Sequence, residues 1–118
     1  DIYWDGEIEN VKENVVTFKS MDDGLRAGFI TLRTYNIDKI NNIRKIINKW
    51  VTNPNVNKDK YIKYIVDTTG INSDKELIWV EKNVEKCQDF CAILKSMCWY
   101  ESKYRPTESE LNNAYNLI

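Results

Sequence analysis

Carboxylates are the side chains of this sequence that could perform acid–base chemistry, because its 118 residues include no histidine. A Ser-His or Cys-His nucleophile system is therefore excluded in its usual form. Glu101 is the leading candidate, because it follows the apolar run 93–100 at the end of a predicted helix, where the dipole favours a protonated carboxyl. The neighbouring Trp99, Tyr100 and Tyr104 could add an apolar wall that raises its pKa further.

A carboxyl with a raised pKa is the general acid that glycoside hydrolysis needs, usually with a second carboxylate nearby. Asp22 and Asp23 are weaker candidates for that second carboxylate, and capping of a helix that begins near Ser20 is the simpler interpretation of both. For Glu101 the alternative is an ordinary charge at a helix end.

The three cysteines, Cys87, Cys91 and Cys98, are spaced by four and seven residues, which predicts that they share one face of a helix. An odd count argues against a disulfide framework, and a metal site would need further ligands. We predict buried thiols and no metal site. The sequence has no glycine-rich phosphate loop, and no cofactor is predicted.

Aromatic residues make up 12% of the chain, and sugar-binding clefts use such side chains as stacking platforms. Trp50, Trp79 and Trp99 are the candidates to line a cleft. All three fall at apolar positions of predicted helices, so packing in the core is the alternative for each.

The charge is nearly balanced, with 17 basic and 18 acidic residues, which argues against a general nucleic-acid binder. Residues 38–63 are an exception, with seven basic and two acidic side chains. This segment could face an anionic polymer, or it could be a solvated helix face. No run approaches the roughly 20 apolar residues of a membrane span. We expect one domain over residues 1–118, truncated at its N-terminus.

The spacing of apolar residues predicts a mainly α (small α+β) fold with five to six helices and at most a short N-terminal β-hairpin. The hairpin would pair residues 8–11 with 15–18. The first helix would follow a capping box at 20–23, with Gly24 and Gly28 forming a face for close packing.

Four further segments have helical patterns. Asp38 is predicted to cap the second helix, and Asn57 the third, which would stop at Gly70. Residues 73–76 have the pattern of another capping box, opening an apolar period that runs to Cys98. That period predicts either one long helix or a break near residues 83–86. Residues 106–110 would begin the last helix.

Residues 18–28 (Phe-Lys-Ser-Met-Asp-Asp-Gly-Leu-Arg-Ala-Gly) resemble a signature of small bacteriophage virion proteins, also found in prophages. That signature is an aromatic residue, Ser, an acidic pair and Gly-Leu-Arg-Ala. The resemblance continues in Ile-Ile-Asn-Lys-Trp at 46–50, in Tyr-Ile at 61–62, and in Tyr100-Glu101, where the family has His-Glu. Pro54 is displaced from the position after the tryptophan.

Trp4 and Gly6, followed by the aromatic-Ser-helix block, are similar in order to peptidoglycan glucosaminidases, in which the catalytic Glu lies on an upstream helix. Because Glu101 comes at the far end of this sequence, the resemblance implies a lysozyme-like domain that is circularly permuted. The resemblance implies a virion-associated glycosidase or lytic transglycosylase that acts on peptidoglycan glycan strands, with Glu101 as general acid. It would work at the cell wall from the virion or the host cytoplasm. The substrate-binding residues would be Trp50, Trp99, Tyr100, Tyr61 and Arg26.

Two alternatives stay open at this point. One is a non-catalytic phage structural or cell-wall-binding protein on the same scaffold, since function depends on the site rather than the fold. The other is a small protein bound to other virion proteins, which an exposed apolar patch would indicate.

Overall fold

The computed structural model describes residues 7–8, 17–18 and 21–118. These contain two short strands, five α-helices and one 3-10 helix, which confirms the mainly helical class. In chain order the elements are β1 (Glu7–Ile8), β2 (Thr17–Phe18), α1 (Met21–Ile37), α2 (Ile43–Trp50), α3 (Lys58–Thr69), η1 (Val84–Cys87), α4 (Gln88–Ser102) and α5 (Glu108–Asn116).

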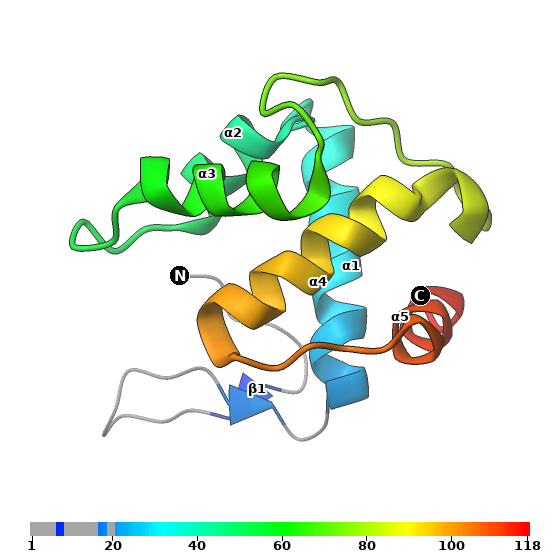
Figure 1. Cartoon of the computed structure of the whole chain (residues 1–118). Coiled ribbons are helices and arrows are strands. Elements are labelled where there is room, and N and C mark those ends of the chain that lie inside the picture. Colours follow the sequence, from blue (N-terminus) through cyan, green and yellow to red (C-terminus); the bar gives the residue numbers. More distant parts are fainter. Residues whose placement is uncertain (1–6, 9–16, 19–20) are drawn as a thin grey trace.

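The long helix α1 runs through the molecule, and α4 crosses in front of it (Figure 1). Helix α1 packs against α5 and α4, whereas α3 packs against α4 and α2. The two longest helices therefore form the centre, and the shorter helices cover their flanks. The largest fully buried side chains come from α1, α2, α3 and α4: Leu25, Phe29, Leu32, Ile43, Ile46, Ile47, Tyr61, Ile65, Phe90, Ile93, Leu94 and Met97.

Helices α1 and α4 approach each other closely at Gly28. A Cβ atom built on this glycine would lie 2.7 Å from Cδ1 of Leu94, closer than carbon atoms pack. Leu94 is fully buried and has little room to yield. The predicted close approach is therefore confirmed at Gly28. Gly24 is also buried.

The strands β1 and β2 pair antiparallel, with Glu7 opposite Phe18 and Ile8 opposite Thr17. This agrees with the prediction of at most a short hairpin before α1. The rest of the predicted hairpin and the capping role of Ser20 fall outside the described residues.

The predicted cap at Asp38 is wrong. Helix α1 continues to Ile37, and the backbone N–H of Asp38 still bonds to the carbonyl of Thr34. Lys39 then adopts a left-handed conformation with φ of 64° and ends the helix. The cap of α2 is Asn42, whose side chain accepts a hydrogen bond from the backbone of Lys45. The apolar stripe that begins at Ile40 had predicted a helix from Asp38 onward, whereas residues 38–42 form the turn between α1 and α2.

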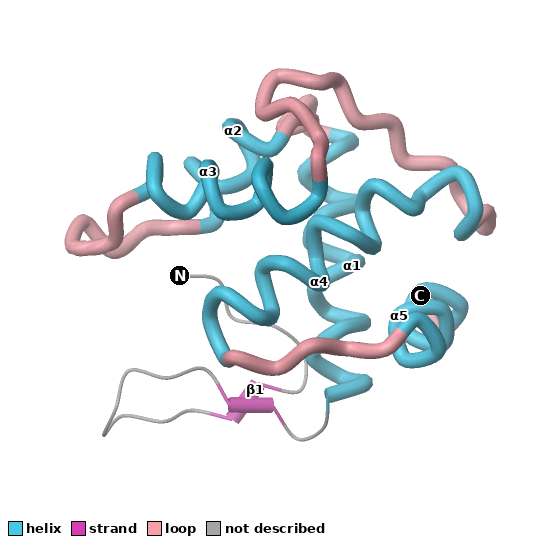
Figure 2. The backbone as a smooth tube through the Cα atoms, viewed as in Figure 1, coloured by secondary structure: helices cyan, strands magenta, loops and turns pink. Residues whose placement is uncertain are grey.

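The predicted helix start at residues 73–76 is also wrong. Residues 70–83 form a long connection without a helix between α3 and η1 (Figure 2). The Asn36 side chain donates to the carbonyl of Leu77 and accepts from the backbone of Trp79. The backbone of Leu77 also donates to the carbonyl of Asn41. These tertiary bonds hold the segment extended, against its local preference for a helix.

Trp79 consequently lies in this connection rather than on a helix, which corrects the sequence prediction for it. Its ring packs at 5.0 Å from Phe90, 5.3 Å from Tyr115 and 6.3 Å from Phe29. The ring thus inserts among residues of α1, α4 and α5. This placement favours the core interpretation over a role in a cleft.

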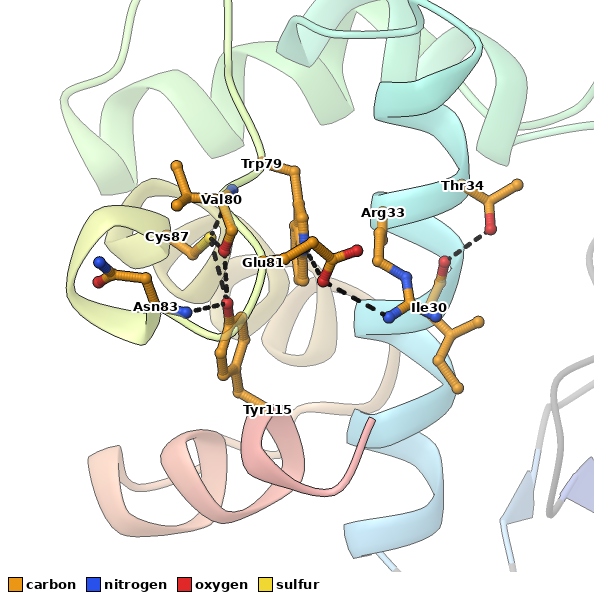
Figure 3. Close-up of polar contacts among 9 residues, drawn as sticks. All are labelled: Ile30, Arg33, Thr34, Trp79, Val80, Glu81, Asn83, Cys87 and Tyr115. Atoms are coloured by element: carbon orange, nitrogen blue, oxygen red, sulfur yellow. Dashed lines mark hydrogen bonds and ion pairs between the residues drawn. The ribbon is translucent and has the colours of Figure 1, made fainter.

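A polar network fixes the end of the same connection to α5 (Figure 3). The Tyr115 hydroxyl donates to the carbonyl of Val80 at 2.7 Å and accepts from the backbone of Asn83 at 2.9 Å. The Cys87 thiol reaches the same carbonyl at 3.3 Å. The network satisfies backbone groups that no helix or strand pairs.

The predicted ends of α3, the break before α4 and the start of α5 are confirmed. Asn57 caps α3, and Gly70 ends it in the left-handed region with φ of 74°. Asn83 caps η1, so the long apolar period is broken within the predicted range. A capping box formed by Thr107 and Glu110 begins α5. Cys87 and Cys91 are buried, and Cys98 is half-buried, all three as free thiols.

Candidate functional site

Glu101 lies in the last turn of α4, and the end of α2 meets it there. The indole N–H of Trp50 donates a hydrogen bond to Glu101 Oε2 at 3.0 Å. Trp50 is the final residue of α2, whose apolar stripe buries its ring. Lys103 ends α4 in a left-handed conformation just beyond Glu101. The carboxylate is therefore held by a side chain from another helix, at the negative end of its own helix.

Burial raises the pKa of Glu101 above its ordinary value, while hydrogen bonding by Trp50 and the proximity of Tyr61 lower it. When the solvent exposure of the whole residue is considered, Glu101 is exposed. The surrounding packing is nevertheless dense enough that desolvation outweighs the other effects on its carboxyl. The net effect is a raised pKa, because the carboxyl lies against the side chains of Trp50 and Tyr61.

The hydroxyl of Tyr61 points into the same region. Tyr61 is fully buried, and its hydroxyl makes no hydrogen bond of good geometry with the described residues. Burial, followed by the charge of Glu101, raises the pKa of this hydroxyl well above its ordinary range. The relationship is thus electrostatic proximity rather than a formed hydrogen bond. It leaves a neutral hydroxyl beside the carboxyl.

Aromatic rings continue from this point along the seam between α3 and α4. The Tyr61 and Tyr100 rings are stacked, with their centroids 4.1 Å apart. The Tyr64 ring lies 5.1 Å from that of Tyr100. Four of the predicted site residues, Trp50, Tyr61, Tyr100 and Glu101, therefore come together in one cluster, which we call the Glu101 cluster.

Trp99 lies on a different side of α4. The Arg105 guanidinium stands 4.7 Å from the centroid of the Trp99 ring, and the Lys103 ammonium stands 5.8 Å from it. Cations at these distances are attracted to the ring face. Trp99 is half-buried, so part of its ring remains accessible.

An open groove of about 410 Å³ runs beside Trp99, between α3, α4 and the start of α5. The side chains that give it chemical character are Tyr64, Lys95, Trp99, Arg105 and Glu108. Glu101 is not among its lining residues. Tyr64 belongs to both features, because it lines the groove and contacts Tyr100 of the Glu101 cluster.

Apart from Trp99, sequence reasoning had missed this groove. Lys95 and Trp99 are four residues apart on α4, a spacing that puts them on one helix face. That signal was available in the sequence. The contributions of Tyr64 and Glu108 come from other helices and depend on the tertiary packing.

Two other predicted site residues lie on α1. Asp23 pairs with Arg26 at 3.4 Å on the same helix. This contact gives both side chains a local role within α1. The structure does not describe the side chain of Asp22, so the second carboxylate of a catalytic pair stays a prediction.

Within the part of the chain that the structure describes, no three Cys, Asp or Glu side chains group closely enough to hold a metal ion. None of the described helices is both long and apolar enough to cross a bilayer.

The sequence matches no protein-family model. It is similar to Protein P5 of Pseudoalteromonas phage PM2, with 32% identity over 76 residues. The match covers 63% of this chain and 48% of the phage protein, so the aligned part spans about half the length of that relative. The chain therefore resembles a phage protein over most of its own length.

Proposed function

We propose that this protein is a phage-type, virion-associated enzyme that cleaves the glycan strand of peptidoglycan, with Glu101 as its general acid. The observation that carries the proposal is the environment of the Glu101 carboxyl. It combines a helix C-terminus, the Trp50 hydrogen bond at 3.0 Å and a pKa that burial raises. The similarity to a phage protein supports the biological setting.

In this proposal Glu101 transfers its proton to the oxygen of the scissile glycosidic bond as the bond from that oxygen to the sugar carbon breaks. The Trp50 N–H donates to Oε2, so in this proposal Oε1 carries the transferable proton. Water or a hydroxyl of the same sugar then forms a bond to that sugar carbon and gives its proton to the Glu101 carboxylate, which restores the acid. The first route is hydrolysis, and the second is transglycosylation.

The half-buried rings of Tyr100 and Tyr64 would serve as the binding surface, because Tyr61 and Trp50 are buried. Tyr100 stacks on Tyr61 and lies beside Tyr64, which extends an aromatic seam away from Glu101. Rings of this kind present apolar faces to the C–H faces of sugars. A polymeric substrate can supply binding energy along such a surface at a distance from the bond that breaks.

A non-catalytic wall-binding protein of the virion is the second candidate function. The observation in its favour is the groove beside Trp99, which Glu101 does not line. A binding protein needs this groove and no general acid. The two functions therefore differ in whether the Glu101 carboxyl is required.

A zymogram on purified peptidoglycan distinguishes the two functions. We expect wild-type protein to clear the gel and Glu101→Gln to leave it intact. Glu76→Gln is a matched control, because Glu76 is an exposed carboxylate outside the cluster. New reducing ends in the digest would indicate hydrolysis, and anhydro sugar ends would indicate transglycosylation. Binding to the walls without clearance by wild type would support the wall-binding function instead.

A further inference from the structure

Two cationic side chains face the groove beside Trp99 without an ion-pair partner among the described residues. Lys95 lies one helical turn before Trp99, and Arg105 stacks over the ring from the loop after α4. Neither takes part in any of the ion pairs between described residues. Their charges are therefore available to an anionic group that enters the groove.

The rest of the groove has a buried, uncharged floor and one acidic residue at its rim. Its floor includes Cys91 and Leu111, which are 5% and 2% exposed. Burial raises the pKa of the Cys91 thiol to about 11, so the floor is uncharged at neutral pH. Glu108 is an exposed carboxylate at the start of α5 and adds one negative charge to the rim. The groove thus offers an apolar floor, an aromatic wall, two cations and one anion.

From this arrangement we infer that the groove binds an amino sugar that carries a short peptide with free carboxylates. In this complex the sugar ring stacks on Trp99, and the peptide carboxylates pair with Lys95 and Arg105. Glu108 accepts hydrogen bonds from amide or ammonium groups of the peptide. The inference deepens the proposed function and rests on it, because peptidoglycan is a glycan that bears such peptides.

The position of the groove suits a binding site for the sugars next to the scissile bond. Tyr64 lines the groove and lies 5.1 Å from Tyr100, and Tyr100 stacks on Tyr61 beside Glu101. An unbroken row of rings therefore joins the groove to the carboxyl. Because Tyr61 is fully buried, a glycan strand would pass over the half-buried rings of Tyr64 and Tyr100. This path places its peptide-bearing sugar in the groove and a neighbouring linkage towards Glu101.

The test measures the affinity of the whole chain for soluble wall fragments by calorimetry. The probes are a disaccharide that bears a tetrapeptide and an uncharged N-acetylglucosamine oligomer of the same sugar length. We expect Arg105→Gln and Lys95→Gln each to weaken binding of the peptide-bearing probe about tenfold, the scale of one charge-assisted hydrogen bond. Neither variant should change the affinity for the uncharged oligomer by more than about twofold.

Control variants separate a specific contact from general attraction. Lys45→Gln removes the same charge from α2, which contributes no residue to the groove, and should leave both affinities unchanged. Trp99→Leu should weaken both probes, since it removes the shared platform. If that variant unfolds, Trp99→Phe replaces it and should keep most of the affinity.

The inference is overturned if the peptide-bearing probe binds with the same affinity to wild type and to both groove variants, or if Lys45→Gln weakens it equally. It is also overturned if neither probe binds at millimolar concentration while the enzyme still clears walls. Failure of the proposed function has a different signature: Glu101→Gln would retain clearance while the groove variants still lose affinity.

Discussion

The indole of Trp50 donates to Glu101 across a 3.0 Å hydrogen bond, which joins the last residue of α2 to the last turn of α4. This hydrogen bond lowers the pKa of a carboxyl that burial raises. Removing the donor while keeping an aromatic ring should therefore raise the Glu101 pKa further. We predict this result for Trp50→Phe, measured by carbon NMR titration of the labelled carboxyl.

Trp79→Phe is the matched control for that titration. The Trp79 indole also donates to a glutamate, Glu81, at 3.3 Å, but outside the Glu101 cluster. This variant should leave the Glu101 titration unchanged. An unchanged titration in Trp50→Phe as well would contradict the view that the indole tunes the carboxyl.

The raised pKa of Glu101 also predicts how stability varies with pH. A carboxyl whose pKa is raised by folding contributes stability below its unfolded pKa, and that contribution is lost as the pH rises through the folded value. Glu101→Gln should remove this loss, so its melting temperature relative to wild type should rise as the pH increases through the folded pKa of Glu101. Thermal unfolding of both proteins across the pH range checks this.

The pKa of Glu110 is shifted in the opposite direction, so this residue serves as a comparison within the same protein. The backbone N–H of Thr107, followed by the Tyr104 hydroxyl, lowers the pKa of its carboxyl. Its contribution to stability is present above the unfolded pKa and is lost as the pH falls through the folded value. The destabilisation caused by Glu110→Gln should therefore disappear in acid. A melting curve of Glu101→Gln with the same pH dependence as Glu110→Gln would refute the assignment for Glu101.

A side chain at Gly28 should destabilise the protein according to its size, because a Cβ there would lie 2.7 Å from Cδ1 of the buried Leu94. Overpacking typically costs about 1–3 kcal/mol, partly offset by roughly 1 kcal/mol of helix propensity when glycine becomes alanine. We predict a loss of about 0–2 kcal/mol for Gly28→Ala and a larger loss for Gly28→Leu. Urea unfolding measures both.

A double-mutant cycle identifies the cause of that loss. Leu94→Ala creates space where the new methyl group would lie, so Gly28→Ala should be less destabilising in that background. Equal effects in both backgrounds would show that Leu94 is not the obstacle.

The hydroxyl of Tyr115 should contribute measurably to stability. It donates to the carbonyl of Val80 and accepts from the backbone of Asn83, two groups that have no partner in a helix or strand. Tyr115→Phe should cost about 1–3 kcal/mol, the scale for leaving a polar group unpaired, because the Asn83 N–H loses its acceptor while the Val80 carbonyl keeps the Cys87 thiol as a donor. Tyr104→Phe is the control, because Tyr104 is exposed and should lose less. Equal losses in the two variants would contradict the structural role of the network.

Local signals predicted a good part of the fold. Asn57 and Gly70 bound α3, and Thr107 and Glu110 begin α5, because caps act through neighbouring backbone groups. The helix predicted after residues 73–76 failed, because Asn36 holds that segment extended through bonds formed across 41 and 43 residues. Such tertiary contacts leave no local pattern.

For the candidate site, too, the sequence predicted the local features and missed those that depend on tertiary packing. Glu101 was proposed from its place at the end of an apolar helix, and that local setting holds. Its contact with Trp50 could not be predicted, because it depends on the angle between α2 and α4. The groove beside Trp99 depends on three helices and was missed for the same reason.

Clearance of purified cell walls, followed by turbidity, tests the central claim most directly. The comparison needs wild type, Glu101→Gln and Glu76→Gln, each shown to fold by its melting curve. Removing a general acid typically lowers a rate by about 100-fold or more, so Glu101→Gln should clear at most about one-hundredth as fast as wild type. Glu76→Gln should match wild type. Equal clearance by Glu101→Gln, or no clearance by wild type, would contradict the proposed catalytic role.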